Sequence, residues 1–249
     1  MTVADRSGPG VPGRGVFVTG ASSGIGAAVA VEWARAGYVV AGASRRGTVP
    51  PGEGKLAPVR LDVNDHAALA TAIDEFATAS GGLAGVVHCA GYHEFRPSAH
   101  LAMDDLRAVL ETNLVSAVRI AQLARPHLAG PGGFVAFIGS FYADLGVPQS
   151  LAYSASKAAL ASVTRTLAVE WAASGIAVVN FAPGYIETGL NADYLTDPEN
   201  RARLERRIPV GRIGTADEVG RLTVAVLTAD CRFLTGETIT VDGAQGRRL

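Results

Sequence analysis

Cysteine is scarce in this chain: Cys89 and Cys231 are the only two among 249 residues, and neither belongs to a C-x-x-C pair. That scarcity excludes a disulfide framework and a cysteine-based metal or redox site. His66, His100 and His127 show no ligand spacing, so we predict no bound metal.

An excess of basic charge is missing too. The chain has 22 Lys and Arg against 23 Asp and Glu, a formal net charge of −1, and its arginine pairs are short. Without a basic excess to neutralise phosphates, we predict no nucleic-acid partner. No apolar run reaches the length of a signal peptide core or a membrane span, so we expect a soluble cytoplasmic protein with no membrane partner.

The chain is rich in apolar residues, which make up 48% against 18% charged, a balance that suits a sheet buried on both faces by helices. Seven short apolar runs alternate with helical patterns, which predicts an α/β fold with a parallel sheet and right-handed crossovers. The runs are 15–20, 38–43, 57–63, 85–91, 134–138, 176–181 and 238–243. Length allows one domain or two. With no repeat or linker, we predict one catalytic domain over 15–249 after a flexible arm at 1–14.

Several boundaries can be placed from local signals. Asn64 is the expected cap of a helix that ends near residue 80. A long amphipathic stretch runs from about Met103 to Leu128, and Pro126 marks its end. Thr215 to Glu218 is a capping box that opens a further helix. Residues 185–210 have mixed polarity, and we expect them to form a mobile segment that covers the substrate.

A glycine-rich turn follows the first predicted strand. The sequence Gly20-Ala21-Ser22-Ser23-Gly24-Ile25-Gly26 leads from that strand into a helical pattern. Missing side chains there let backbone N–H groups approach a pyrophosphate at the positive end of a helix. Together with the alternating pattern, this turn predicts a single Rossmann-type, doubly wound, seven-stranded sheet with helices on both faces. Ala90 and Gly91, after the fourth run, would let a ring pass close to the backbone.

The second predicted strand ends in Ser44-Arg45-Arg46, with no acidic residue. In dinucleotide-binding folds an acidic residue here binds the ribose hydroxyls, whereas arginine accommodates a 2′-phosphate. The two guanidiniums therefore favour NADP(H) over NAD(H) as the cofactor. The alternative is that one or both are solvated loop arginines.

Tyr153 and Lys157 lie four residues apart, on one face of a predicted helix. A phenol titrates near ~10, and a nearby cation favours the phenolate. Tyr153 would then be an acid/base residue and Lys157 the group that lowers its pKa. Ser140 follows a buried strand, at the end where open α/β sheets bind ligands. Such a pair also occurs by chance as a solvated couple, so its meaning depends on the rest of the chain.

Several separate pieces of the chain resemble the short-chain dehydrogenase/reductase family, in the family's order and over nearly its full length. They are T-G-A-S-S-G-I-G at 19–26, Asp62-Val63, Ala90-Gly91, Asn113, Ser140, Y-S-A-S-K at 153–157, P-G-Y-I-E-T at 183–188 and T-G-E-T-I-T-V-D-G at 235–243. Each piece alone is common in proteins, but their joint occurrence at compatible spacings is very unlikely by chance.

The resemblance implies catalytic roles for four residues. Tyr153 would exchange a proton with the substrate oxygen, and Ser140 would hydrogen-bond that oxygen. Lys157 would hold the nicotinamide ribose, and Asn113 would anchor a water that reprotonates it. The implied cofactor contacts are with Asp62 and Val63 at the adenine and with Pro183, Gly184, Ile186 and Thr188 at the carboxamide.

The chain departs from the family at His88-Cys89, where N-N commonly precedes A-G. In the family, an asparagine at this place normally links neighbouring strands. Its absence leaves open how rigid this part of the sheet is. We expect His88 and Cys89 to be buried and unreactive, and His93 to be a plain loop histidine, although it could face the substrate.

We therefore predict an NADP(H)-dependent oxidoreductase that interconverts a ketone and a secondary alcohol, acting as a ketoreductase. The alternatives are an NAD-dependent alcohol dehydrogenase and a nucleotide-binding regulator without turnover. The expected partner is a small carbonyl or alcohol substrate, and a similarity to acyl-carrier-protein ketoreductases leaves that class open. We expect a partly apolar substrate wall formed by Phe141, Tyr142, Leu145, Val147, Leu190, Tyr194 and Leu195. The resemblance also implies a homotetramer or dimer.

Overall fold

The computed structural model describes residues 14–52, 54–128, 132–189, 191–229, 231 and 233–247. All but the last residue of the predicted arm at 1–14 lies outside the described residues. Seven parallel strands form the main sheet in the order β3-β2-β1-β4-β5-β6-β9. The strands are β1 (Gly15–Thr19), β2 (Val39–Ser44), β3 (Lys55–Arg60), β4 (Leu83–His88), β5 (Phe134–Ile138), β6 (Ala177–Pro183) and β9 (Thr238–Val241). The predicted seven-stranded doubly wound sheet is confirmed.

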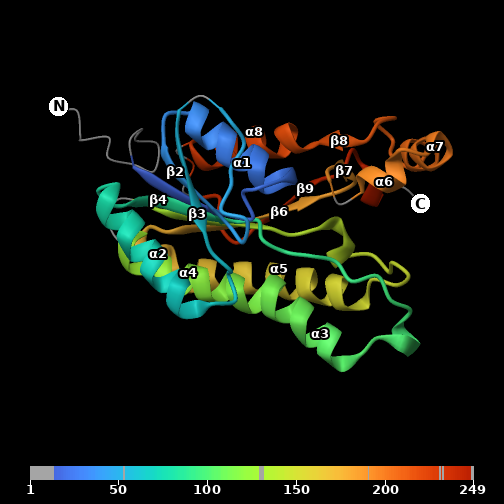
Figure 1. Cartoon of the computed structure of the whole chain (residues 1–249), viewed down its shortest axis with the longest axis horizontal. Coiled ribbons are helices and arrows are strands. Elements are labelled where there is room, and N and C mark those ends of the chain that lie inside the picture. Colours follow the sequence, from blue (N-terminus) through green and yellow to red (C-terminus); the bar gives the residue numbers. More distant parts are fainter. Residues whose placement is uncertain are drawn as a thin grey trace.

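Helices cover both faces of this sheet (Figure 1). On one face lie α1 (Gly24–Arg35) and α8 (Ala216–Leu227). On the other lie α2 (His66–Ala79), α4 (Ser116–Leu128) and α5 (Leu151–Trp171), with α3 (Met103–Leu110) extending from α4 through a π-helical turn (Glu111–Val115). Because every strand is parallel, the carboxyl ends of β1, β4, β5 and β6 meet at one edge, where ligands bind in folds of this type.

The alternation of side chains along β1 explains the two layers. Phe17 packs into the cluster under α2, α4 and α5, while its neighbours Val16 and Val18 pack into the cluster under α1 and α8. All three are fully buried. Successive side chains of a strand point to opposite faces, so a strand covered on both sides must be apolar throughout.

One of the predicted boundaries is wrong by one residue. Asp65, not Asn64, caps α2, and its carboxylate accepts a hydrogen bond from the Ala68 N–H at 3.0 Å. The Asn64 amide instead donates to Thr112. The amphipathic stretch ends at Leu128 as predicted, with Pro126 inside the last turn of α4. The capping box at Thr215 is confirmed, with both reciprocal hydrogen bonds present.

The segment expected to cover the substrate contains regular structure. A two-residue strand β7 (Ile186–Glu187) pairs with β8 (Gly214–Thr215), and α6 (Ala192–Leu195) and α7 (Pro198–Glu205) lie between them. The segment has a small core of its own, formed by Leu195, Leu204, Ile208 and Ile213. Its mobility stays a prediction.

In the part of the chain that the structure describes, none of the helices combines the length and the apolar character needed to cross a membrane.

Candidate active site at the carboxyl edge of the sheet

The glycine-rich turn between β1 and α1 has the geometry that the sequence predicts. Gly20 and Gly24 adopt left-handed φ values of 71° and 56°, which residues with side chains rarely tolerate. A methyl group at Gly26 would overlap the carbonyl oxygen of Gly20. The turn is therefore packed too closely for side chains at these positions, and it lies at the α1 N-terminus, where a phosphate group is favoured.

Arg46 lies beside this turn. Its guanidinium donates to the Ser22 hydroxyl at 2.8 Å and to the Ser23 hydroxyl at 2.8 Å, so three groups able to bind a phosphate converge. Arg45 is exposed, and its charge partly opposes the rise in the pKa of Tyr92 that burial causes. The two arginines therefore have different surroundings. The Ser44 hydroxyl accepts from Gly47 N–H and is buried in its own turn.

The remaining residues predicted to bind the cofactor lie along the same edge. Asp62 is exposed just beyond β3 and accepts from the Asn64 N–H, while Val63 is buried. Gly91 lies between two predicted catalytic residues: a methyl group there would be 3.1 Å from Asn113 Oδ1 and 3.6 Å from Lys157 Nζ. Ala90 packs against Gly20 so closely that a methyl group at Gly20 would be 2.9 Å from the Ala90 nitrogen.

Thr188 lies opposite the glycine-rich turn, where a methyl group on Gly24 would be 3.3 Å from Thr188 Cβ. Asn191 fixes this loop, because its amide oxygen accepts from Thr188 N–H and its amide nitrogen donates to Ile186 O, both at 2.9 Å. Sequence reasoning missed Asn191, because an Asn near a turn gives no sign of which backbone groups it binds. Pro183 ends β6, and a methyl group at Gly184 would lie 2.6 Å from Asp242 Cβ.

Ser140, Tyr153 and Lys157 converge at the end of β5. Ser140 is buried just beyond the strand, and its hydroxyl accepts from Tyr142 N–H. Tyr153 and Lys157 lie on α5, with Lys157 Nζ 5.6 Å from the centre of the Tyr153 ring. Lys157 is buried and donates to the Ile138 carbonyl at 2.7 Å. The predicted set is therefore assembled by one strand end and one helix face.

The electrostatics of this set are governed mainly by burial. Burial raises the pKa of Tyr153 above its ordinary value, and the hydrogen bond with Ser140 opposes that shift. Burial lowers the pKa of Lys157 to about 8, so its charge is only partly retained in mildly alkaline solution. In the chain alone the pKa of Tyr153 is shifted by burial and by Ser140, while Lys157 faces the Ile138 carbonyl, so the lowering of the Tyr153 pKa by Lys157 stays a prediction.

Asn113 is fully buried in the π-helical turn, which settles the choice left open between a surface residue and a hydrogen-bonding one. Its amide oxygen accepts from Tyr92 N–H, and its amide nitrogen donates to Tyr92 O and to Ser156 Oγ. Ser156 in turn donates to the Tyr153 carbonyl. Asn113 thus joins the loop after β4 to the catalytic helix. Its role in proton supply stays a prediction.

His88 occupies the place of the family asparagine and ties three elements together. Thr19 Oγ1 accepts from the N–H groups of Cys89 and Ala90, so its own proton points to His88 Nδ1 at 3.0 Å. Nε2 then donates to Ser116 Oγ at 3.3 Å. Burial first, and then the charge of Lys157, lower the pKa of His88 to about 3. His88 is a buried neutral residue, as predicted, and it restores the missing tie.

An aromatic wall adjoins Tyr153. His93 stacks on the Tyr153 ring with centroids 4.3 Å apart, and Tyr142 meets both rings edge-on at 5.9 Å. Tyr142 and Tyr185 share a hydrogen bond between their hydroxyls at 3.3 Å. The expectation of a plain loop histidine at His93 is wrong, because this stack depends on tertiary placement that no local pattern encodes.

The other residues expected in the wall have differing surroundings where the structure describes them. Leu195 packs inside the α6–α7 core, Leu145 and Tyr194 are exposed, and Leu190 lies outside the described residues. Within the described ranges, no group of three His, Cys, Asp or Glu side chains is arranged to hold a metal ion. The absence of a bound metal stays a prediction.

Comparison with known proteins agrees with this geometry. A family model described as enoyl-(acyl carrier protein) reductase matches residues 20–244. Glucose 1-dehydrogenase of Gluconobacter oxydans is 33% identical over 93% of this chain and 91% of its own length. 3beta-hydroxysteroid dehydrogenase 1 of Eggerthella lenta is 32% identical over 93% of both chains. A solved gluconate 5-dehydrogenase from Burkholderia cenocepacia, in complex with NADP and tartrate, superposes with a TM-score of 0.85 at 29% identity, covering 96% of this chain and 97% of that one.

The fold and the site thus define a dinucleotide-binding oxidoreductase. The chain belongs to the short-chain dehydrogenase/reductase family, and it is an enzyme that acts on the CH–OH groups of alcohols and on ketones.

Proposed function

We propose that the chain is an NADP(H)-dependent ketoreductase that uses Tyr153 as its general acid. The observation that carries this proposal is the convergence of Ser140, Tyr153 and Lys157 at the end of β5, facing the glycine-rich turn across the edge of the sheet. The glycine-rich turn at Gly20–Gly26 and the N-terminus of α1 fit a pyrophosphate, so the residues present suit a nicotinamide nucleotide.

A bound nicotinamide nucleotide supplies the hydride that becomes the new C–H bond. The chain supplies position and the proton. Tyr153 donates its phenolic proton to the carbonyl oxygen as the π electrons of the C=O bond move to that oxygen, which leaves a phenolate and a secondary alcohol. Ser140 hydrogen-bonds the same oxygen, and Lys157, fixed at Ile138 O, stabilises the phenolate until it regains a proton.

The cofactor preference rests on Arg46. Its guanidinium and the hydroxyls of Ser22 and Ser23 form a cradle that suits a 2′-phosphate, and no carboxylate lies at the end of β2 to bind free ribose hydroxyls. An NAD-dependent alcohol dehydrogenase is therefore the weaker alternative. Preference for NADPH also sets the direction toward reduction in the cell.

The names of relatives leave the substrate open, since they range from glucose to a steroid. We propose a small carbonyl compound that lies against the aromatic wall and is covered by α6 and α7. Leu151 and Val169 on α5 are 47% and 81% exposed, which supports pairing of this helix in a homodimer or homotetramer.

Titration with NADPH and NADH, followed by the fluorescence of the reduced nicotinamide, tests the cofactor assignment. We expect tight NADPH binding that weakens in Arg46→Ala and in Arg45→Ala, because each removes a cation from the phosphate site. Arg35→Ala, which removes an exposed arginine paired with Glu32 on α1, is the matched control and leaves binding unchanged. Equal or better binding of NADH would reverse the preference. Binding of neither nucleotide would overturn the proposed function.

A further inference from the structure

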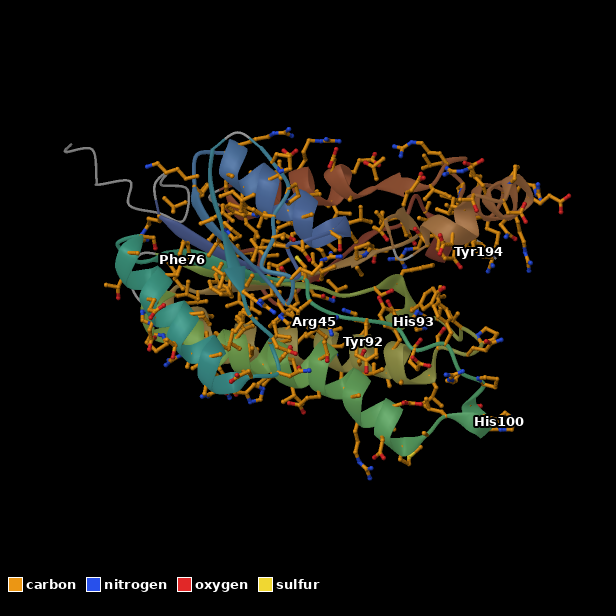
Figure 2. The ribbon with its side chains drawn as sticks, in the orientation of Figure 1. Arg45, Phe76, Tyr92, His93, His100 and Tyr194 are labelled. Atoms are coloured by element: carbon orange, nitrogen blue, oxygen red, sulfur yellow. The ribbon has the colours of Figure 1, made fainter. Side chains whose placement is uncertain are left out.

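His93 is held in a stack of three rings. Phe95 lies on one side with centroids 3.7 Å apart and Tyr153 on the other at 4.3 Å, with interplanar angles of 27° and 15°. Figure 2 shows His93 on the loop that follows β4, with His100 at the distant tip of the same loop. The imidazole is therefore one ring thickness from the proposed general acid.

The loop around His93 is fixed on both sides. Asn113 binds the N–H and carbonyl of Tyr92, and Arg96 N–H donates to the Gln149 carbonyl at 3.0 Å. Gln149 adopts a left-handed φ of 62°, a conformation that costs energy for a residue with a side chain. Hydrogen bonds at Tyr92 and at Arg96 thus hold the backbone on both sides of His93, and the stack holds its ring.

One nitrogen of this ring has no partner. His93 Nε2 is buried and forms no hydrogen bond with any of the described residues, whereas both ring nitrogens of His88, five residues earlier, are hydrogen-bonded. A buried polar group left unpaired costs about 1–3 kcal/mol. Burial lowers the pKa of His93 to about 4, so the ring is neutral near pH 7 and one nitrogen donates while the other accepts.

We propose that His93 is the substrate-recognition residue of this site, and that its Nε2 hydrogen-bonds an oxygen on the carbon next to the reacting carbonyl. The substrate class is then the 2-hydroxyketones and the corresponding 1,2-diols. This inference rests on the proposed ketoreductase function, because it places the reacting oxygen at Tyr153.

Two features support an oxygen at the adjacent carbon. The stack keeps the imidazole beside the phenol, so a group that reaches Nε2 while its neighbour reaches Tyr153 must lie close to the reacting carbon. A hydroxyl can donate or accept, so it satisfies Nε2 in either tautomer. Phe95, which is 60% exposed, stacks on the face of the imidazole, and a hydrogen bond to Nε2 lies in the plane of that ring, so the stack and the hydrogen bond are compatible.

The test compares NADPH-dependent reduction of 2-hydroxycyclohexanone with that of cyclohexanone, which lacks only the hydroxyl. We expect kcat/KM to be about 10- to 100-fold higher for the hydroxyketone, the range that an unpaired buried polar group implies. In His93→Phe, which keeps an aromatic ring in the stack, that ratio falls toward one. In His93→Gln, whose amide nitrogen can take the place of Nε2, part of the ratio returns. His100→Phe, an exposed histidine on the same loop, leaves it unchanged.

A binding measurement separates this inference from the proposed function. Calorimetry with oxidised cofactor present should show tighter binding of 1,2-cyclohexanediol than of cyclohexanol in the wild type, and equal binding in His93→Phe. A ratio near one in the wild type, or an unchanged ratio in His93→Phe, overturns the role of His93 while ketone reduction stands. Cofactor binding with no reduction of either ketone overturns the substrate class, and loss of cofactor binding overturns the proposed function itself.

Discussion

The two halves of the sheet edge use different kinds of groups. The nucleotide-binding half lies at the ends of β1 to β3, and the catalytic half lies at the ends of β4 to β6. The first presents backbone and exposed side chains: the glycine turn, Arg46 and its two serine partners. The second presents buried polar side chains from separate elements, among them Ser140, Asn113 and Lys157.

The difference affects how each half responds to substitution. An exposed group acts mainly through its own contact with a ligand. Substituting it therefore changes the binding free energy by about what that one contact contributes. Buried polar groups in the catalytic half are hydrogen-bonded to one another, so their pKa values and positions depend on their neighbours. We therefore expect the largest catalytic effects, and the clearest effects of pH, in the β4–β6 half.

Tyr153→Phe is expected to give the largest effect. Loss of the phenolic hydroxyl removes the proton donor, and kcat for ketone reduction should fall by about 100- to 10,000-fold. The ring stack with His93 is retained, so NADPH affinity and the melting temperature should stay close to those of the wild type. Steady-state kinetics beside a fluorescence titration measure both, and undiminished reduction would remove Tyr153 from its role.

Asn191→Ala tests the loop that follows β6 and lies opposite the glycine turn, through a residue that binds its backbone. Without the amide, Thr188 N–H and Ile186 O lose their shared partner and the loop opposite Gly24 loosens. We expect NADPH binding to weaken about 5- to 20-fold, the equivalent of roughly 1–2 kcal/mol, with kcat less affected. Asn200→Ala on α7 is the matched control. Equal affinity in the two variants would contradict the assignment.

Gly26→Ala tests how closely the glycine turn packs. The added methyl group overlaps the Gly20 carbonyl, so we expect a loss of about 1–3 kcal/mol in the free energy of unfolding. Gly146→Ala, at a position with no atom within 4 Å of the added methyl group, should cost much less. Denaturant unfolding of both variants gives the comparison, and equal stabilities would mean that the turn has more room than its geometry indicates.

His88 makes the stability of the catalytic half depend on pH. Its pKa of about 3 in the folded chain lies below the ordinary value of 6.5, so its contribution is complete above pH 6.5 and is lost as the pH falls toward 3. Over that range the free energy of unfolding should fall by about 1.4 kcal/mol per pH unit for this one proton. His88→Asn should flatten the slope of a denaturant-unfolding series over this pH range by that amount, and an unchanged slope would contradict the assignment.

The smallest expected effect is a difference between the two cysteines in their rate of modification by a thiol reagent. Burial raises the pKa of the Cys89 thiol to about 12, whereas Cys231 is exposed. Cys89 is half-buried and its thiol is little ionised at pH 8, so a thiol reagent should modify Cys231 of the folded chain faster than Cys89. Mass spectrometry of the labelled peptides gives the two rates, and faster labelling of Cys89 would contradict the raised pKa.

Sequence patterns predicted the nucleotide-binding half better than the catalytic half. Glycines between a strand and a helix, and arginines after the next strand, are local signals that determine local geometry. The spacing of a family pattern also predicted which four polar residues, Asn113, Ser140, Tyr153 and Lys157, to examine, and their catalytic roles stay predictions. The stack of His93 on Tyr153, the ties made by His88 and the direction of the Tyr153 pKa depend on which groups tertiary packing brings together, and on how much water it excludes.

Isotope transfer tests the central claim most directly. NADPH carrying deuterium at the transferable position is mixed with the enzyme and a panel of cyclic, hydroxy-substituted and aryl ketones, and each alcohol product is examined by mass spectrometry. If this chain is a ketoreductase, one deuterium atom appears on the carbinol carbon of at least one product and none appears with Tyr153→Phe. Tight NADPH binding with no deuterium in any alcohol would contradict the account.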